Sequence, residues 1–187
     1  MSELDEAAVV VRDQLAAEGM LLRRHYCPAA VCAPSRASLL TGRYPSRHGL
    51  LGNPTPDGTP AVDQLALAAD EILLPQLLRP RGYATGMIGK WHLGHSKKEF
   101  LPCSRGFDYQ YGCYNGMIDY YTHMFNYRIR GISAGGITGV EDINEEWKED
   151  GNDWNRNDEP LNEEGYATDL IADEAIKVVE NHDSSNQ

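Results

Sequence analysis

A short segment near the N-terminus joins a cysteine to an arginine and to residues that start and stop a helix. Pro34 suits a first helical turn and Gly42 suits the left-handed position that ends a helix in the run Cys32-Ala33-Pro34-Ser35-Arg36-Ala37-Ser38-Leu39-Leu40-Thr41-Gly42. Cys32 is therefore expected at a helix N-terminus, where backbone N–H groups and the helix dipole favour an anion. Arg36 follows one turn later on the same face and adds a forked donor. The segment predicts an oxyanion site at Cys32.

A second candidate segment is Gly89-Lys90-Trp91-His92-Leu93-Gly94, which directly follows a stretch with the character of a buried strand, residues 83–88. Ligands of α/β sheets bind at the carboxyl ends of strands, so Lys90 and His92 are candidate site residues. A fixed ammonium group can hold a tetrahedral anion while a nucleophile attacks it. An imidazole that titrates near neutrality can hydrogen-bond a hydroxyl or take its proton. We therefore expect Lys90 and His92 to act beside Cys32.

Three helices are predicted from the spacing of apolar residues. They cover residues 3–18, 74–79 and 166–181. Thr168 is expected to cap the start of the third helix. The inner face of that helix is expected to carry five apolar residues, namely Leu170, Ile171, Ala175, Val178 and Val179.

Strands and loops alternate with these helices. Residues 20–26 are expected as a short strand that leads to the Cys32 turn, and residues 83–88 as a buried strand. Residues 44–60 are rich in turn formers and predict an exposed loop, and the acidic residues 135–164 predict mostly loop with a short hairpin. The alternation favours an α/β fold in which a layered sheet is packed between helices.

Composition and charge limit the classes of partner. The chain has 187 residues and 41% hydrophobic content, enough for one domain with a core. Its formal net charge of −11 argues against a nucleic-acid partner. Residues 1–110 hold 12 basic and 11 acidic residues, whereas residues 111–187 hold 5 and 17, so the half with both segments is nearly neutral. No signal peptide is visible at Met1 and no transmembrane segment is expected.

The remaining cysteines and histidines are given no catalytic role. Cys27 is expected as a buried thiol. Cys103 and Cys113 are close enough in sequence for a disulfide, although spacing alone does not establish the bond. His48 and His123 are expected to be structural or to face solvent. A zinc site is not favoured, because the cysteines lack the close paired spacing of such sites.

The Cys32 segment resembles the signature of the type I sulfatases, C-x-P-S-R-x-x-L-x-T-G, at every fixed position, and residues 89–94 resemble their G-K-W-H-L-G motif. The resemblance implies an alkaline-phosphatase-like sandwich in which a mostly parallel central sheet lies between helices. It implies that a formylglycine-generating enzyme converts Cys32 to formylglycine, whose hydrated aldehyde is the nucleophile and a ligand of Ca²⁺. It further implies that Arg36 and Lys90 neutralise the charge of the sulfate and that His92 positions or deprotonates the hydroxyl.

Further segments resemble sulfatases in the expected order: residues 74–78, 105–108, 120–123 and 166–169. Their pattern is closest to the arylsulfatase B group, which removes sulfate from N-acetylgalactosamine units of glycosaminoglycans. The resemblance implies a sulfuric ester hydrolase of the arylsulfatase type, a sulfated small molecule or glycan as substrate, and a lysosomal or secreted location. Two alternatives stay open: a phosphoester or phosphonate hydrolase of the same superfamily, and a non-catalytic remnant that at most binds sulfated glycans.

The chain departs from the sulfatase pattern at its metal ligands. No Asp-Asp pair precedes Cys32, and the later histidine, Asp-Asn pair and second lysine of the family are not found before Gln187. A hard cation needs several oxygen ligands, and only residue 32 is carried over. Residues 1–187 are therefore expected to be a partial N-terminal catalytic domain that lacks the first strand and the C-terminal part. Unpaired sheet edges would then leave this chain marginally stable and nearly inactive.

Overall fold

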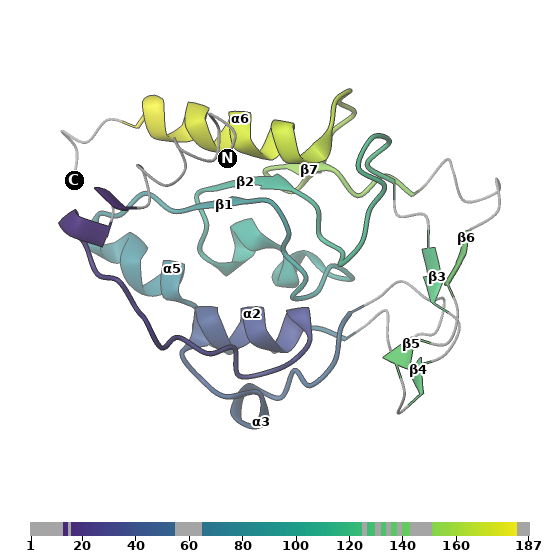
Figure 1. The fold of residues 1–187 in the computed structure, drawn as a ribbon, viewed down its shortest axis with the longest axis horizontal. Helices are drawn as coiled ribbons and strands as arrows, with labels where there is room; N and C mark the ends of the chain where they lie inside the picture. The colour runs from purple at the N-terminus through teal and green to yellow at the C-terminus, as the bar shows by residue number, and fades with distance from the viewer. Residues whose placement is uncertain are drawn as a thin grey trace.

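The sheet of this protein lies between helix α6 on one face and helix α2 on the other (Figure 1). The computed structural model describes residues 13–54 apart from residue 15, residues 65–124, residues 151–182, and the backbone of four short strands between residues 127 and 142. The helix predicted over residues 3–18 falls mostly outside the described residues, and its last residues, 16–18, are helical.

Helix α2 (Cys32–Thr41) begins and ends where its sequence signals predict. Pro34 lies in the first turn, and Gly42 ends the helix with a φ of 68°. Ala33 and Ala37, one turn apart, are both fully buried on the face that meets the sheet. Their small side chains let the backbone of α2 lie close to the residues that follow the first strand of the sheet.

The other helical elements are short and connect the strands. They are α3 (Pro45–His48), α5 (Leu74–Leu78) and the 3-10 turns η1 (Arg79–Arg81), η2 (Lys98–Phe100) and η3 (Pro102–Arg105). The prediction of a helix over residues 74–79 is confirmed, and Gly82 ends η1 with a positive φ. In the described part of the chain, no helix has the length and apolar character needed to cross a membrane.

The central sheet has the strand order β1-β2-β7-β8. Its strands are β1 (Gly86–Ile88), β2 (Tyr109–Gly112), β7 (Asn155–Arg156) and β8 (Glu159–Pro160). β1 and β2 run parallel, whereas the β2–β7 and β7–β8 pairs are antiparallel. The described sheet is therefore mixed. The strand predicted over residues 83–88 is present in its carboxyl-terminal half, which is β1.

The short hairpin predicted within residues 135–164 is confirmed. β7 and β8 form a hairpin whose turn residues Asn157 and Asp158 have φ of 52° and 66°, a conformation that asparagine and aspartate tolerate. Two further antiparallel pairs are separate from the central sheet. They are β3 (Tyr127–Ile129) with β6 (Val140–Asp142), and β4 (Ile132–Ser133) with β5 (Gly136–Ile137).

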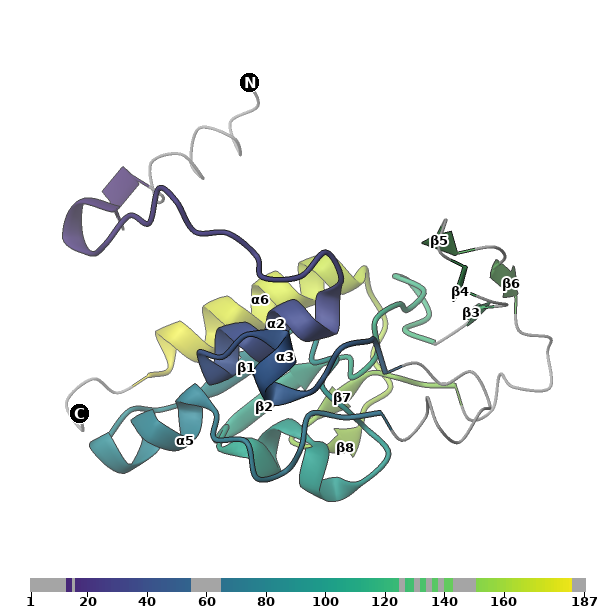
Figure 2. The same ribbon diagram turned by 90° about the horizontal axis from the view of Figure 1, so that it is seen from below.

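Each face of the sheet has its own hydrophobic core. Met87 of β1 belongs to the core that also contains Trp91 and the alanines of α2. Its neighbour Ile88 packs on the other face, where Tyr111 and Trp154 are buried under α6. Successive residues of a strand point to opposite faces, so Met87 and Ile88 contribute to different cores. Figure 2 shows the same layers from below, and the predicted arrangement of a sheet between helices is confirmed.

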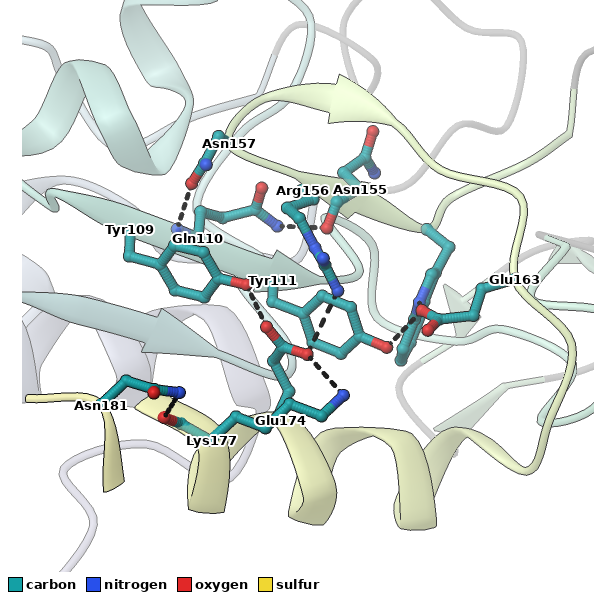
Figure 3. Close-up of polar contacts among 11 residues, drawn as sticks. Tyr109, Gln110, Tyr111, Asn155, Arg156, Asn157, Glu163, Glu174, Lys177 and Asn181 are labelled. Carbon is teal, nitrogen blue, oxygen red and sulfur yellow. Dashed lines mark hydrogen bonds and ion pairs between the residues drawn. The ribbon is translucent and has the colours of Figure 1, made fainter. Parts of the chain in front are cut away.

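Helix α6 (Ala167–Glu180) is fixed to the sheet by a buried carboxylate (Figure 3). Glu174 accepts a hydrogen bond from the hydroxyl of Tyr109. The same carboxylate lies 3.1 Å from Nη2 of Arg156 on β7 and 3.5 Å from Nζ of Lys177. A buried charge is tolerated only when it is paired and hydrogen-bonded, and this one has three partners. Glu174 therefore sets the position of α6 on the sheet.

Four local expectations are wrong. The exposed loop predicted over residues 44–60 contains helix α3, and His48 and Leu50 in this segment are buried. Residues 20–26 form no strand and are exposed, because no neighbouring strand in the described chain pairs with them. Helix α6 begins at Ala167, whose N–H donates to the carbonyl of Tyr120, so Thr168 lies inside the first turn instead of capping it. Val179 was expected on the inner face and is exposed, because it lies near the end of α6 beyond the part that covers the sheet.

Candidate active site

Cys32 is the first residue of α2 and is a partly exposed, free thiol. The N–H of the next residue, Ala33, donates to Oδ1 of Asn53 at 3.0 Å. Pro34 has no N–H, so the first turn offers fewer free donors than the sequence suggests. The positive end of the helix dipole still lies at Cys32 and favours a negative charge there.

Arg36 ties α2 to the segment that follows β1. Its Nε donates to the carbonyl of Trp91 at 2.8 Å, and its Nη2 donates to the carbonyl of Lys90. Desolvation lowers the pKa of the half-buried guanidinium, and the nearby sulfur atoms of Cys113 and Cys32 oppose that shift. Two of the five N–H donors of the guanidinium are thus spent on backbone carbonyls. Arg36 therefore determines where Lys90 lies relative to Cys32.

The segment with Lys90 and His92 continues beside β2 past the end of β1. The N–H groups of Trp91 and His92 each donate to a carbonyl in the segment that follows β2, both at 2.8 Å. The ammonium group of Lys90 donates to the carbonyl of Gly116 in the same segment at 3.1 Å. Lys90 is therefore held from two sides, through its own carbonyl by Arg36 and through its side chain by Gly116.

Two glycines permit this close approach. A Cβ on Gly112 would lie 2.3 Å from the carbonyl oxygen of Gly89, and the φ of Gly112 is 125°. A Cβ on Gly116 would lie 2.5 Å from Cε1 of the His92 ring. Neither distance is possible for a real side chain, so the segment after β2 packs directly against the backbone and the imidazole of the site.

His92 is a neutral, buried imidazole. Its Nε2 lies 2.8 Å from the carbonyl of Pro54, and since a carbonyl only accepts, Nε2 carries the proton. Burial, followed by the positive charge of Lys90, lowers the pKa of His92 to about 4. Nδ1 is therefore an acceptor, and it is buried with no hydrogen-bond partner among the described residues. The expectation of an imidazole that titrates near neutrality is wrong, because the ring is desolvated beside cations.

Comparison with known proteins decides the family. The sequence profile named Sulfatase matches residues 6–187. The chain belongs to the sulfatase family. Arylsulfatase J of Mus musculus is 38% identical over 138 residues, which make up 74% of this chain and 22% of that protein. The N-acetylgalactosamine-6-sulfatase of Sus scrofa is 43% identical over 113 residues, or 57% of this chain and 22% of that protein. The sulfatase chain thus spans about a fifth of the length of these curated relatives.

The comparison with solved structures agrees with the assignment to the sulfatase family. Ps i-CgsB in complex with k-i-k-neocarrahexaose matches with a TM-score of 0.62 and 27% identity, over 83% of this chain and 32% of that chain. BT4656 in complex with its substrate D-glucosamine-2-N,6-O-disulfate matches with a TM-score of 0.54 and 27% identity, over 93% and 26%. The predicted α/β, alkaline-phosphatase-like fold is confirmed. The matching relatives have several different sulfatase names, so the arylsulfatase B assignment stays a prediction.

The four predicted site residues of the sulfatase chain lie in one neighbourhood. Cys32 and Arg36 are one helical turn apart on α2, and the sulfur of Cys32 acts on the pKa of Arg36. Lys90 and Arg36 both lower the pKa of His92. Arg36 is therefore close to residue 32, and its hydrogen bond to the carbonyl of Lys90 brings the backbone of Lys90 to the same region.

Three residues of the site were missed by sequence reasoning. Asn53 lies 20 residues from Ala33, whose N–H donates to its side chain. Nothing in the sequence around Asn53 indicates that it caps the start of α2. Gly112 is the last residue of β2 and Gly116 lies four residues later, and neither belongs to a sequence motif. A glycine after a strand indicates close backbone approach in general, but only the fold shows which atoms approach.

The two histidines predicted as structural are buried and hydrogen-bonded. Nδ1 of His48 accepts from the N–H of Leu50 at 3.2 Å, so Nε2 carries the proton that points to Oγ of Ser38 at 3.0 Å. His123 stacks on Trp154 with ring centroids 4.5 Å apart. Both histidines therefore hold the fold, as expected.

The cysteines outside the motif differ from one another in exposure. Cys27 is exposed, so the expectation of a buried thiol is wrong; it directly follows the exposed residues 20–26, which form no strand. Cys103 and Cys113 are both free thiols. Burial raises the pKa of Cys103 to about 11 and that of Cys113 to about 12, which keeps both protonated and unreactive at neutral pH.

Sulfatases of this family are generally formylglycine-dependent and calcium-binding. Among the residues that the structure describes, no group of three or more His, Cys, Asp or Glu side chains is placed to hold a metal ion. Calcium takes about six to eight oxygen ligands, so the described residues do not assemble a calcium site. Residue 32 can contribute one ligand.

Proposed function

We propose that this chain supplies the nucleophile and the anion-binding groups of a sulfuric ester hydrolase that acts on sulfated sugars. The observation that carries the proposal is the pair of hydrogen bonds from Arg36 to the carbonyls of Lys90 and Trp91. These bonds join the helix that starts with Cys32 to the segment that contains Lys90 and His92. The sugar is inferred from the relatives, one named N-acetylgalactosamine-6-sulfatase and one solved with a disulfated glucosamine as its substrate.

Residue 32 is the nucleophile in this proposal, after a formylglycine-generating enzyme has converted the cysteine. The hydrated aldehyde of formylglycine supplies a nucleophilic hydroxyl. Cys32 suits the conversion because it is a free thiol that no disulfide holds. The positive end of the α2 dipole favours the negative charge that develops at this position during attack.

The cations of the site hold the sulfate group. The ammonium of Lys90 is fixed by the carbonyl of Gly116 and can offer its remaining protons to the sulfate oxygens. Arg36 acts mainly by positioning the backbone of Lys90, and its charge adds to the field that attracts the anion. A preorganised cation needs no reorientation when charge shifts in the transition state, and this is the source of its effect.

His92 serves as an acceptor. With a pKa of about 4 it is neutral above pH 5 and brings no positive charge to the site. Its Nε2–H is engaged by the carbonyl of Pro54, so Nδ1 is the atom that can accept a hydrogen bond or a proton from the attacking hydroxyl. We further infer a lysosomal or secreted location from the family resemblance.

The test begins at residue 32. The chain is co-expressed with a formylglycine-generating enzyme, and the peptide across Cys32 is analysed by mass spectrometry, with Cys32→Ser as the control that cannot form the aldehyde by this route. We expect an aldehyde in place of the thiol. A longer protein that contains this chain is then assayed side by side on an aryl sulfate and an aryl phosphate. An unconverted thiol, or a preference for the phosphate ester, contradicts the proposal.

A further inference from the structure

A cavity of about 650 Å³ lies between the loop after β2 and the start of helix α6. Lys90 lines it together with Gly116, the residue whose carbonyl holds the Lys90 ammonium group. Three tyrosines, Tyr120, Tyr121 and Tyr166, also line it. The cavity thus joins the proposed sulfate-binding lysine to a group of aromatic rings.

The three tyrosines form one exposed cluster. Tyr166 stacks on Tyr120 with centroids 5.7 Å apart and an interplanar angle of 29°, and its centroid lies 5.2 Å from that of Tyr121. The exposed fractions are 53% for Tyr120, 72% for Tyr121 and 38% for Tyr166. Aromatic rings left in water contribute little to folding, and a contiguous exposed group of this kind marks a binding surface.

The loop that presents Tyr120 and Tyr121 is held rigidly by its own hydrogen bonds. Oδ1 of Asp119 accepts from the N–H of Thr122 at 2.7 Å and from that of Tyr121 at 2.9 Å, and these bonds lower the pKa of Asp119. The N–H of His123 donates to the carbonyl of Asp119 at 2.9 Å. The two tyrosines therefore lie on a closed turn whose conformation is set before any ligand binds.

The same loop is tied to the start of α6, which carries the third tyrosine. The N–H of Ala167 donates to the carbonyl of Tyr120 at 2.8 Å, and Nε2 of His123 lies 3.1 Å from the carbonyl of Gly165. His123 is buried against Trp154. The fold thus buries the histidine to hold the backbone and leaves the neighbouring tyrosines in solvent.

We infer that this cavity is the subsite for the sugar ring that carries the sulfate ester, with Tyr120, Tyr121 and Tyr166 as its stacking surface. The inference rests on the proposed function, because Lys90 must hold the sulfate at one end. A pyranose ring presents C–H groups on its faces, and these are attracted to the negative face of an aromatic ring. The ionised Asp119 carboxylate, which also lines the cavity, can accept hydrogen bonds from sugar hydroxyls.

Tyrosine suits such a surface better than an aliphatic side chain would. It offers a large rigid contact area, it loses little rotamer freedom on binding, and its hydroxyl can donate to or accept from a sugar hydroxyl. A rigid surface beside a fixed cation also limits the entropy lost when the ligand binds. The expected ligand is a sulfated hexosamine unit, bound through its ring face and its sulfate.

Calorimetric binding tests this inference on the unconverted 187-residue chain, with N-acetylgalactosamine 6-sulfate and inorganic sulfate as probes. The variants are Tyr121→Ala, Tyr121→Phe and Lys90→Met. Tyr83→Ala is the matched control, because Tyr83 is 52% exposed and precedes β1 at the end of that strand away from Lys90. Thermal unfolding of each variant shows that it is folded.

We expect Tyr121→Ala to weaken binding of the sulfated sugar roughly ten-fold, while inorganic sulfate binds as before. Tyr121→Phe keeps the ring and most of the affinity, and Lys90→Met weakens both probes. Absence of sugar binding, an unchanged sugar affinity in Tyr121→Ala, or an equal loss in Tyr83→Ala overturns the subsite. Failure of the proposed function would show instead as an unconverted thiol at residue 32. The binding measurements use the unconverted chain and do not depend on that aldehyde.

Discussion

Replacement of Arg36 by methionine tests whether its guanidinium joins the two segments of the site. Methionine keeps a similar apolar stem and removes both hydrogen bonds, to the carbonyls of Lys90 and Trp91. A hydrogen bond from a charged donor contributes about 1.5–3 kcal/mol, so two contribute roughly 3–6 kcal/mol. Burial of the guanidinium carries a desolvation cost, which also lowers the pKa of Arg36. Methionine removes this cost, so part of the loss is offset. We expect the free energy of unfolding to fall by about 2–3 kcal/mol.

Urea unfolding followed by tryptophan fluorescence measures this change, since Trp91 and Trp154 are buried and report on both cores. With a slope of about 2 kcal/mol per molar urea, the midpoint of Arg36→Met falls by about 1–1.5 M. Arg43→Met is the matched control. The side chain of Arg43 is 49% exposed and that of its partner Glu71 is 12% exposed, so we expect the loss of this one ion pair to cost less than the loss of both Arg36 hydrogen bonds.

Arg36→Lys separates charge from geometry. An ammonium group keeps the positive charge but cannot reproduce the planar fork that reaches two carbonyls at once. We expect most of the loss of Arg36→Met to persist in this variant. Equal urea midpoints for Arg36→Met and Arg43→Met would refute the reasoning, and full stability of Arg36→Lys would show that charge, and not the fork, holds the segments.

Three further predictions follow from buried groups. Gly116→Ala forces a methyl group against the His92 ring. We expect the free energy of unfolding to fall by about 1–3 kcal/mol and the imidazole signals to shift in NMR spectra. Unchanged NMR spectra would contradict this packing. Burial raises the pKa of Asp153 to about 6, so its carboxyl carbon should titrate near pH 6, and a midpoint below about 4.5 would be inconsistent with its burial. Because the folded pKa is the higher one, protonated Asp153 stabilises the fold at low pH, and about 3 kcal/mol of this contribution disappears as pH rises from about 4 to about 6. Iodoacetamide at pH 8 should label exposed Cys27 quickly and buried Cys113 only after unfolding; similar labelling rates for the two thiols would show that Cys113 is accessible.

The helices of this chain were predictable to the extent that their signals are local. Pro34 and Gly42 mark the ends of α2 because the constraints of proline and the left-handed preference of glycine act within one turn. Strand formation depends on a partner. Residues 20–26 have the composition of a strand but form none, since none of the described strands pairs with them. The same dependence explains why the short hairpin predicted within residues 135–164 could not be located at β7 and β8 from the sequence.

The candidate site was also predictable only in part. The types and order of Cys32, Arg36, Lys90 and His92 were readable, because chemistry constrains which residues can hold and attack a tetrahedral anion. Their protonation was not readable, since it depends on which groups surround them. His92 is neutral because the fold buries it beside Lys90, and no local pattern of residues specifies that burial.

The sequence alone determined which side chains could do chemistry and where α2 starts and stops, because both depend on residue identity and short-range sterics. The tertiary structure decided what those side chains touch. Arg36 uses its donors on backbone carbonyls more than 50 residues away, and tyrosines from residues 120 and 166 stack on one another. Such contacts follow from the pairing of β2 with β1 and the packing of α6 on the sheet, which are long-range consequences of burying both cores at once.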